Sequence, residues 1–229
     1  TTTAANSEEN SYACYLDEFR YAFLGDEYSV KWMEDSDKRD LIKTTLNDQF
    51  ELVKAETRNS HVMMYGDTSM GKIQLSKFQG SKMAEPVVLP KVPCGETLNG
   101  DVPISILRYK LAKATDTRSR MSVEKVLNKT LKNRSFLKSK IAQIVAFVSK
   151  ENEAITKPLL LCNREAKYSI CYEDAVQHFN NRCFNLAKNP FALQSLCFFI
   201  NACQSGYTLV KMIAAMDAVC THPNITGTV

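Results

Sequence analysis

Short apolar segments alternate with polar turns over the first 30 residues. Residues 11–15 (SYACY) have the small and aromatic side chains of a buried strand end, and residues 24–26 (LGD) are typical of a turn. Apolar side chains then recur at helical spacing, which predicts an amphipathic helix from about Asp37 to Thr57 with Ser36 as its N-cap. The apolar positions of this helix are Leu41, Ile42, Leu46, Phe50 and Val53.

The next 45 residues carry strand signals and then chain breakers. Residues 61–65, a Gly66-Asp67 turn and residues 72–78 predict a strand hairpin or an edge element. From Gly80 to about Pro103 the chain has too many prolines and glycines for a regular element. We therefore expect a linker there, exposed to proteolytic nicking.

From Ser122 onward the apolar pattern is helical. One apolar face runs along residues 123–131, and a second, along residues 136–148, almost continues it before Lys157-Pro158 breaks the run. Further helical spacing covers residues 175–184, 191–203 and 209–219. Four to six helices in about a hundred residues predict a small helical bundle.

Length and composition set wide bounds. The 229 residues have room for one large domain or two small ones, and 45% hydrophobic with 24% charged residues is ordinary for a globular protein. No apolar run reaches the roughly 18 to 20 residues of a membrane span. The sequence shows neither an initiating Met nor the apolar core of a signal peptide, so we expect a fragment or a processed product.

Charge is distributed unevenly. Residues 108–140 carry 11 basic and two acidic side chains, whereas residues 1–60 carry 13 acidic and seven basic ones. The two regions can attract each other, and protonation of the carboxylates would weaken the contact, which suggests a pH-sensitive internal clamp. The simpler alternative is a solvated helix face. A nucleic-acid partner is disfavoured because aromatic side chains are not interleaved with the basic ones.

Eight cysteines and three N-glycosylation sequons, at Asn128, Asn133 and Asn224, favour a secretory or endolysosomal protein with disulfides. No CxxC or HExxH spacing points to zinc or to a thioredoxin-like centre. We therefore expect no metal and no cofactor.

Seven short segments within residues 1–80 resemble the legumain family, the asparaginyl endopeptidases of cysteine peptidase family C13. The most specific of them is residues 32–37 (WMEDSD); the others are residues 2–6, 11–15, 24–26, 28–30, 61–66 and 78–80. The resemblance implies an α/β C-terminal remnant of a caspase-like catalytic domain. It also implies that the catalytic Cys and His of the family lie before Thr1, so we expect this chain to be inactive alone. His61, His178 and His222 fall outside the family's catalytic motif, and we expect structural or surface roles for them.

By the same similarity, Ser11 and Asp26 belong to the S1 pocket, which holds the residue before the scissile bond. A fixed carboxylate beside a hydroxyl can accept the two N–H donors of an Asn side chain, whereas it repels an ionised Asp. The resemblance thus implies cleavage after Asn, and after Asp at acidic pH. Asn10 and Glu27 depart from the family pattern, so neighbouring subsites are expected to differ. Without the resemblance, a strand-end hydroxyl and a turn Asp would be the simpler interpretation.

The helical half resembles the four-cysteine legumain prodomain, a death-domain-like helical bundle, through residues 169–172, 178–185, 201–203 and 216–220. This resemblance implies the disulfides Cys171–Cys203 and Cys183–Cys220, whereas four cysteines alone allow three pairings. Of the remaining four, Cys14 and Cys162 stay unassigned. We expect Cys197 to be a buried small hydrophobe, and Cys94 is either reactive or paired.

Three parts are therefore expected: the end of a caspase-like domain (1–80), a linker with an activation peptide (81–121) and a helical prodomain (122–229). Candidate self-cleavage sites are Asn99, Asp101 and Asp116. The resemblance implies a zymogen part whose prodomain blocks and stabilises the active site at neutral pH, in the secretory pathway and then lysosomal, vacuolar or extracellular. Expected partners are the catalytic domain itself, protein or peptide substrates, and cystatin-type inhibitors. The alternative is a stand-alone, non-catalytic inhibitor or binding module for an intact asparaginyl endopeptidase.

Overall fold

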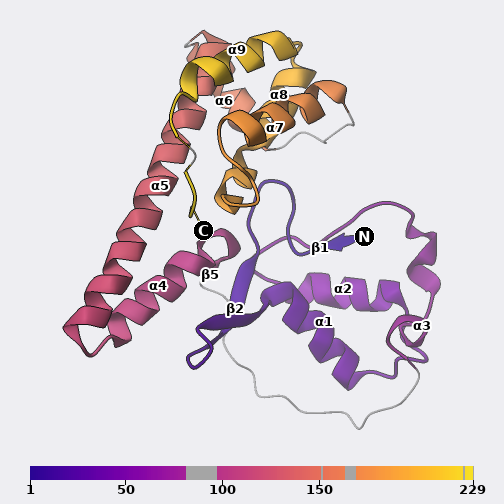
Figure 1. Ribbon diagram of the computed structural model, residues 1–229. Helices are drawn as coiled ribbons and strands as arrows, with labels where there is room; N and C mark the ends of the chain where they lie inside the picture. The colour runs from indigo at the N-terminus through magenta and orange to yellow at the C-terminus, as the bar shows by residue number, and fades with distance from the viewer. Residues whose placement is uncertain (81–96, 151, 163–168, 224, 229) are drawn as a thin grey trace. The chain divides into compact units, whose positions relative to one another are not determined.

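The computed structural model describes residues 1–80, 97–150, 152–162, 169–223 and 225–228 (Figure 1). The chain divides into two compact units, Thr1–Ile106 and Leu107–Val229. The first unit combines antiparallel strands with helices, whereas the described part of the second consists of helices and their connections. The structure thus has the mixed first half and the helical second half that the sequence pattern predicts.

Strand β2 is the centre of a three-stranded antiparallel sheet in the first unit, between β3 and β5. Ala13 of β2 lies opposite Asp26 in β3 and opposite Thr97 in β5. A separate antiparallel pair joins β1 to β4, with Thr2 opposite Met64. The strands are β1 (Thr2–Thr3), β2 (Tyr12–Asp17), β3 (Ala22–Asp26), β4 (Met63–Met64) and β5 (Thr97–Leu98).

Residues 24–26, predicted as a turn, belong to strand β3 instead. The turn precedes them, where the Asp17 carboxylate accepts the N–H groups of Phe19 and Arg20 at 2.9 and 2.8 Å. Gly25 lies in the strand opposite Cys14, and a Cβ atom on it would meet Val30 at 3.2 Å. The lack of a side chain at Gly25 therefore allows β3 to pack closely against α1, and this glycine does not form a turn.

The single helix predicted over residues 37–57 is wrong, because two helices cover this region. Helix α1 (Glu27–Lys38) ends where the prediction begins, and Ser36 lies inside it with its hydroxyl donating to the Trp32 carbonyl. Helix α2 (Leu46–Glu56) starts at a Thr45 N-cap, whose side chain and that of Asp48 form a reciprocal capping box. This second capping signal lies inside the predicted helix and decides the boundary.

Of the two alternatives predicted for residues 61–78, a hairpin or an edge element, the hairpin is wrong. Strand β4 pairs with the distant β1, and Gln74 makes only an isolated bridge to Thr45. The segment between them forms the 3₁₀ helix η1 (Thr68–Lys72), and the short helix α3 (Ser76–Gln79) follows. Asp67 begins η1 by accepting the Ser69 N–H at 2.8 Å.

The end of the predicted linker is regular. Residues 97–98 form β5, residues 99–101 form the 3₁₀ helix η2, and Pro103 lies in the first turn of α4, where a missing N–H is tolerated. The breakers therefore begin an element here rather than interrupt one. Residues 81–96 lie outside the described residues.

Helix α5 (Thr117–Ser149) is continuous over 33 residues, so the two predicted apolar faces belong to one helix. It begins five residues before the predicted start, because Asp116 caps its N-terminus by accepting the Ser119 N–H at 2.8 Å. Pro158, predicted to break the helical run, lies inside α6. The other elements are α4 (Val102–Lys113), α6 (Glu153–Leu160), α7 (Ile170–Arg182), the 3₁₀ helix η3 (Pro190–Ser195), α8 (Cys197–Gln204) and α9 (Leu209–Val219).

The helices of the second unit share one apolar core. Ile144 of α5, Phe179 of α7, Phe199 of α8 and Met216 of α9 are all fully buried in it. The rings of Phe179 and Phe199 lie 5.4 Å apart in a tilted arrangement. Packing of this kind, rather than helix propensity alone, stabilises short helices such as α8.

Candidate functional site

Ser11 and Asp26 lie at the same end of the β2–β3 ribbon. Ser11 immediately precedes β2 and Asp26 is the last residue of β3, and the two strands are antiparallel. The Ser11 carbonyl accepts the N–H of Asn99 at 2.9 Å, which ties this end of the ribbon to the residue after β5. Both residues are half-buried. The fold therefore places at one end of the ribbon the two residues that the resemblance assigns to one pocket.

The Asp26 carboxylate has a fixed position at the N-terminus of α1. Its Oδ1 atom accepts the Ser29 N–H at 2.7 Å, and the Ser29 hydroxyl in turn accepts the Asp26 N–H at 3.0 Å. This reciprocal capping box restricts the Asp26 rotamer without a partner from another part of the chain. A carboxylate held in this way can select a ligand by its hydrogen-bond donors.

Glu27, next to the candidate pocket residue, points inward. Only 6% of it is exposed, and its two carboxylate oxygens each accept a backbone N–H at 3.1 Å, from Arg58 and Asn59. The departure from the family pattern at this position thus has a structural role, joining the start of α1 to the end of α2. No sequence signal identified this role.

The sequence also missed a pocket of about 240 Å³ elsewhere in the first unit. It lies beside α1, α2 and the β1–β4 pair, and its walls include Trp32, Phe50 and Met64. Ser11 and Asp26 do not line it. Its apolar walls come from separate elements, among them α1, α2, β4 and η1, so only the tertiary structure brings them together.

The three histidines have structural partners. His61 Nδ1 lies 2.9 Å from Glu9 Oε2, and the backbone N–H of His61 donates to Glu9 Oε1. Burial raises the pKa of Glu9, but the hydrogen bonds from His61 outweigh it and hold the pKa below its ordinary value. His222 Nδ1 lies 2.9 Å from the Pro223 carbonyl oxygen, which accepts from it, and the His222 ring lies 4.9 Å from that of Phe136.

Three disulfides join the helices of the second unit. Cys171–Cys203 and Cys183–Cys220, with S–S distances of 2.04 and 2.01 Å, are the pairs that the resemblance implies. The third bond, Cys162–Cys197, corrects the expectation that Cys197 is a buried small hydrophobe. Both cysteines are half-buried, Cys162 just after α6 and Cys197 at the start of α8. Helical spacing does not reveal that these two positions meet. Cys14 is also disulfide-bonded, and Cys94 lies outside the described residues.

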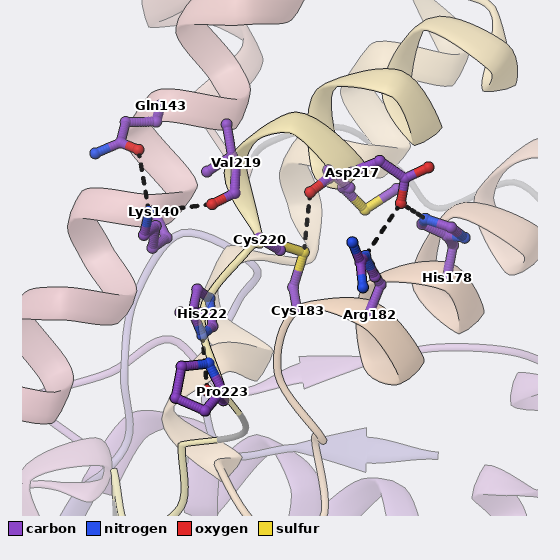
Figure 2. The surroundings of a disulfide bond; sticks show 11 residues. Lys140, Gln143, His178, Arg182, Cys183, Asp217, Val219, Cys220, His222 and Pro223 are labelled. Carbon is purple, nitrogen blue, oxygen red and sulfur yellow. Dashed lines mark hydrogen bonds and ion pairs between the residues drawn. A yellow bond between two sulfur atoms is a disulfide. The ribbon is translucent and has the colours of Figure 1, made fainter.

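Figure 2 shows how α5, α7 and α9 meet around the Cys183–Cys220 bond. The Asp217 carboxylate of α9 lies 2.9 Å from His178 Nε2 and 3.4 Å from Arg182 Nε. His178 and Arg182 both belong to α7. Lys140 of α5 donates to the Val219 carbonyl at 3.0 Å, at the C-terminal end of α9, where a positive charge is favourable. The bond is thus flanked by polar contacts on two sides.

The candidate cleavage sites lie on either side of α4. Asn99 and Asp101 are exposed in η2, and Asp116 is exposed in the short connection between α4 and α5. The Ser119 N–H donates to the Asp116 carboxylate, and this interaction holds the pKa of Asp116 below its ordinary value. A protease would reach Asp116 most readily if the flanking helix ends unwound.

Two of the three sequons lie on α5. Asn128 is exposed, whereas Asn133 is half-buried and its amide donates to the Thr226 and Gly227 carbonyls at 3.0 and 3.4 Å. Asn224 lies outside the described residues. No helix in the described ranges is long and apolar enough to cross a membrane.

Comparison with known proteins covers both halves of the chain. Residues 1–81 match the Peptidase C13 family, and residues 125–220 match the family described as legumain, prodomain. Legumain of Bos taurus is 40% identical over 225 residues, which cover 96% of this chain and 52% of the bovine one. Hemoglobinase of Schistosoma japonicum is 32% identical over 228 residues, covering 96% and 52%. Vacuolar-processing enzyme of Ricinus communis is 30% identical over 264 residues, covering 99% and 51%.

The chain spans about half the length of these relatives. The two family matches follow each other in the order peptidase and then prodomain, and together they include most of the strands and helices described above. This confirms the resemblance seen in the sequence: the chain belongs to the peptidase C13 family and corresponds to a C-terminal portion of legumain that includes the prodomain.

Proposed function

We propose that this chain is the C-terminal part of the zymogen of a cysteine endopeptidase that cleaves after Asn, and after Asp at acidic pH. The observation that carries the proposal is the fixed Asp26 carboxylate at the same end of the β2–β3 ribbon as Ser11, within the part that matches the peptidase family. Each described cysteine is disulfide-bonded, so none of them is the attacking thiolate. In this proposal the nucleophile and its base belong to a part of the enzyme outside this chain.

The chemistry of the pocket follows from hydrogen-bond donors. The side-chain amide of Asn presents two N–H donors and one acceptor, and a carboxylate beside a hydroxyl accepts the donors. An ionised Asp substrate offers no donor and is repelled by Asp26, whereas a protonated Asp offers one O–H donor. Selection of Asn at neutral pH and of Asn or Asp at acidic pH is the expected result.

The helical second unit acts, in this proposal, as a prodomain that blocks and stabilises the active site at neutral pH. Two observations support it: the match of residues 125–220 to the legumain prodomain and the exposed basic side chains along α5, among them Arg118, Lys125 and Lys132. Protonation of carboxylates at acidic pH would weaken its electrostatic contact with an acidic partner surface. The contact acts at short range, since salt screens exposed charges beyond about 8–10 Å.

We also propose a caspase-like fold for the first part of the chain and a death-domain-like bundle for the prodomain. The proposed boundaries of the three parts are 1–80, 81–121 and 122–229. Protein or peptide substrates and cystatin-type inhibitors are the proposed partners. A lysosomal or vacuolar location after the secretory pathway is supported by the disulfides and by the relative named vacuolar-processing enzyme.

The first test is the intact mass and N-terminal sequence of the native protein, isolated from its source at neutral pH. A species of roughly twice this mass, with a Cys and a His before Thr1, supports the zymogen. The precursor is then produced with Asp26→Asn, which keeps the N-cap because Asn caps as well as Asp. We expect kcat/KM for an Asn peptide to fall about 100-fold or more, because the carboxylate that accepts the substrate amide is lost.

Asp67→Asn is the matched control, since Asp67 is another N-cap, is exposed and lies outside the β2–β3 ribbon. Its effect on kcat/KM should stay within about two-fold. Equal activities of the Asp26 and Asp67 variants would show that Asp26 does not select the substrate.

A native start at or near Thr1 would instead favour the alternative, a non-catalytic inhibitor of an intact asparaginyl endopeptidase. The observation behind this alternative is that the chain carries a prodomain match while its described cysteines are all in disulfides. The purified chain would then be titrated into an intact asparaginyl endopeptidase. Inhibition at neutral pH that disappears on acidification would support it, and no inhibition at either pH would remove it.

A further inference from the structure

The C-terminal segment 225–228, here named the C-terminal clasp, lies along α5 and is held through its backbone. Arg134 Nε donates to the Thr228 carbonyl at 2.8 Å, and Asn133 Nδ2 donates to the Thr226 and Gly227 carbonyls. Thr228 is fully buried and only 6% of Arg134 is exposed. Two consecutive side chains of α5 therefore hold three consecutive carbonyls of the clasp.

The segment that leads into η3 also holds the clasp. Asn189, fully buried, donates from Nδ2 to the Ile225 carbonyl at 2.8 Å, and the Gly227 N–H donates to the Lys188 carbonyl at 3.3 Å. The Arg134 guanidinium lies 4.2 Å from the centre of the Phe191 ring, which fixes the orientation of its donors. The clasp thus joins α5 to the η3 region in the second unit.

One of these donors also lies in a glycosylation sequon. Asn133 begins the sequon Asn133-Arg134-Ser135. Glycosylation forms a bond between Asn133 Nδ2 and the anomeric carbon of a sugar; the donor's sugar–phosphate bond breaks, its lipid pyrophosphate leaves, and Nδ2 loses one proton. The nitrogen that contacts the clasp carbonyls would then carry the bulky glycan on the same side.

We propose that the docked C-terminal clasp and a glycan on Asn133 exclude each other, so that modification of Asn133 decides whether the C-terminal segment is bound to α5. Asn128 provides the internal comparison, because it is exposed on the same helix and its sequon ends at Thr130. A glycan there leaves the clasp in place. The inference uses only the second unit and does not depend on the proposed protease function.

The test uses the full chain secreted from a eukaryotic host, which supplies the lipid-linked oligosaccharide. Four forms are compared: wild type, Ser135→Ala, a deletion of residues 225–229, and Asn128→Gln. Ser135→Ala abolishes the Asn133 sequon while keeping the amide that holds the clasp. Glycopeptide mass spectrometry gives the occupancy of each sequon, and hydrogen exchange gives the protection of the Gly227 N–H in each glycoform.

We expect Gly227 to exchange at least about tenfold faster in molecules that carry a glycan on Asn133 than in Ser135→Ala. Modification of Asn128, or its loss in Asn128→Gln, should leave that rate unchanged. If wild type is unmodified at Asn133, the deletion should raise its occupancy, because the competing segment is gone.

Three results would overturn the proposal: a protected Gly227 in molecules glycosylated at Asn133, an unprotected Gly227 in Ser135→Ala, or an Asn133 that stays unmodified in both wild type and the deletion. Each is read from the occupancy and exchange of the same samples.

Discussion

Glu27 and Asp35 show two outcomes for a buried acid on the same helix. Glu27 receives backbone N–H groups on both oxygens, so its charge is compensated by hydrogen bonds from the end of α2. Burial raises the pKa of Asp35, although Gln49 and Arg39 oppose this, with Arg39 Nε at 2.7 Å. Because the folded-state pKa of Asp35 is raised, its ionised form opposes folding above that pKa, and this effect is relieved as the pH falls through it.

At this scale we predict that Glu27→Gln lowers the free energy of unfolding of the first unit by about 2–3 kcal/mol. The amide offers only one acceptor oxygen and places an NH₂ donor against a backbone N–H, so one of the two bonds is lost and two donors face each other. Urea denaturation at pH 7 checks this, together with hydrogen exchange of the Arg58 and Asn59 amides. Glu51→Gln, at an exposed position of α2, is the control; equal losses in the two variants would contradict the role of Glu27.

At the scale of the elements, the connection between α4 and α5 combines a helix cap with a candidate cleavage site. Asp116 caps α5, and its lowered pKa means that the carboxylate stays ionised below the ordinary aspartate value of 3.8. The cap therefore stabilises α5 above that ordinary value and is lost as the pH falls through the lower folded-state pKa. The proposed pocket rejects an ionised Asp, so the same carboxylate also resists cleavage until the cap protonates.

We therefore predict that self-cleavage after Asp116 in the precursor needs a more acidic pH than cleavage after an uncapped Asp, because the cap holds its pKa below the ordinary value. Asp116→Asn is expected to be cleaved there at near-neutral pH. Asn keeps the cap and supplies the neutral amide that the proposed pocket selects. N-terminal sequencing of material incubated over a pH series identifies the new ends. Asp101→Asn is the comparison, because it makes the same substitution at another exposed candidate site. New ends after none of Asn99, Asp101 and Asp116 would contradict all three candidate sites.

At the scale of the whole molecule, the second unit depends on crosslinks between helices that are distant in sequence. The three disulfides span separations of 32, 35 and 37 residues, and loops of this size are stabilised by about 2–4 kcal/mol per bond. They differ in burial: Cys183 and Cys220 are each 1% exposed, whereas Cys162 and Cys197 are half-buried. The Cys183–Cys220 bond is part of the buried core, whereas the Cys162–Cys197 bond is partly accessible to solvent.

We predict that replacing both Cys183 and Cys220 by Ser destabilises the second unit more than replacing both Cys162 and Cys197. The two loops are nearly equal in length, so their entropic contributions match within about 0.1 kcal/mol. Two serine hydroxyls in the buried site add a desolvation cost of about 1–3 kcal/mol each unless they find partners. Urea midpoints of the two double variants decide the comparison, and equal midpoints would show that burial of the bond does not matter.

The sequence by itself determined the features that depend on near neighbours and on resemblance. Helical spacing identified the apolar faces of α5 and the helical character of the second unit, because residues three and four apart share a helix face. The resemblance supplied the family, which the comparisons confirm, and the pairs Cys171–Cys203 and Cys183–Cys220. The assignment of Ser11 and Asp26 to a substrate pocket stays a prediction.

The tertiary structure decided the features that depend on residues far apart in the chain. Strand β4 pairs with β1 across some 60 residues, and Cys162 meets Cys197, because packing rather than local propensity selects these partners. The same holds for Glu27, whose burial is set by the end of α2, and for Asn133, whose amide is occupied by the C-terminal clasp. A local pattern sets the secondary-structure propensity of each residue, whereas its contacts with residues distant in sequence are set only by the folded chain.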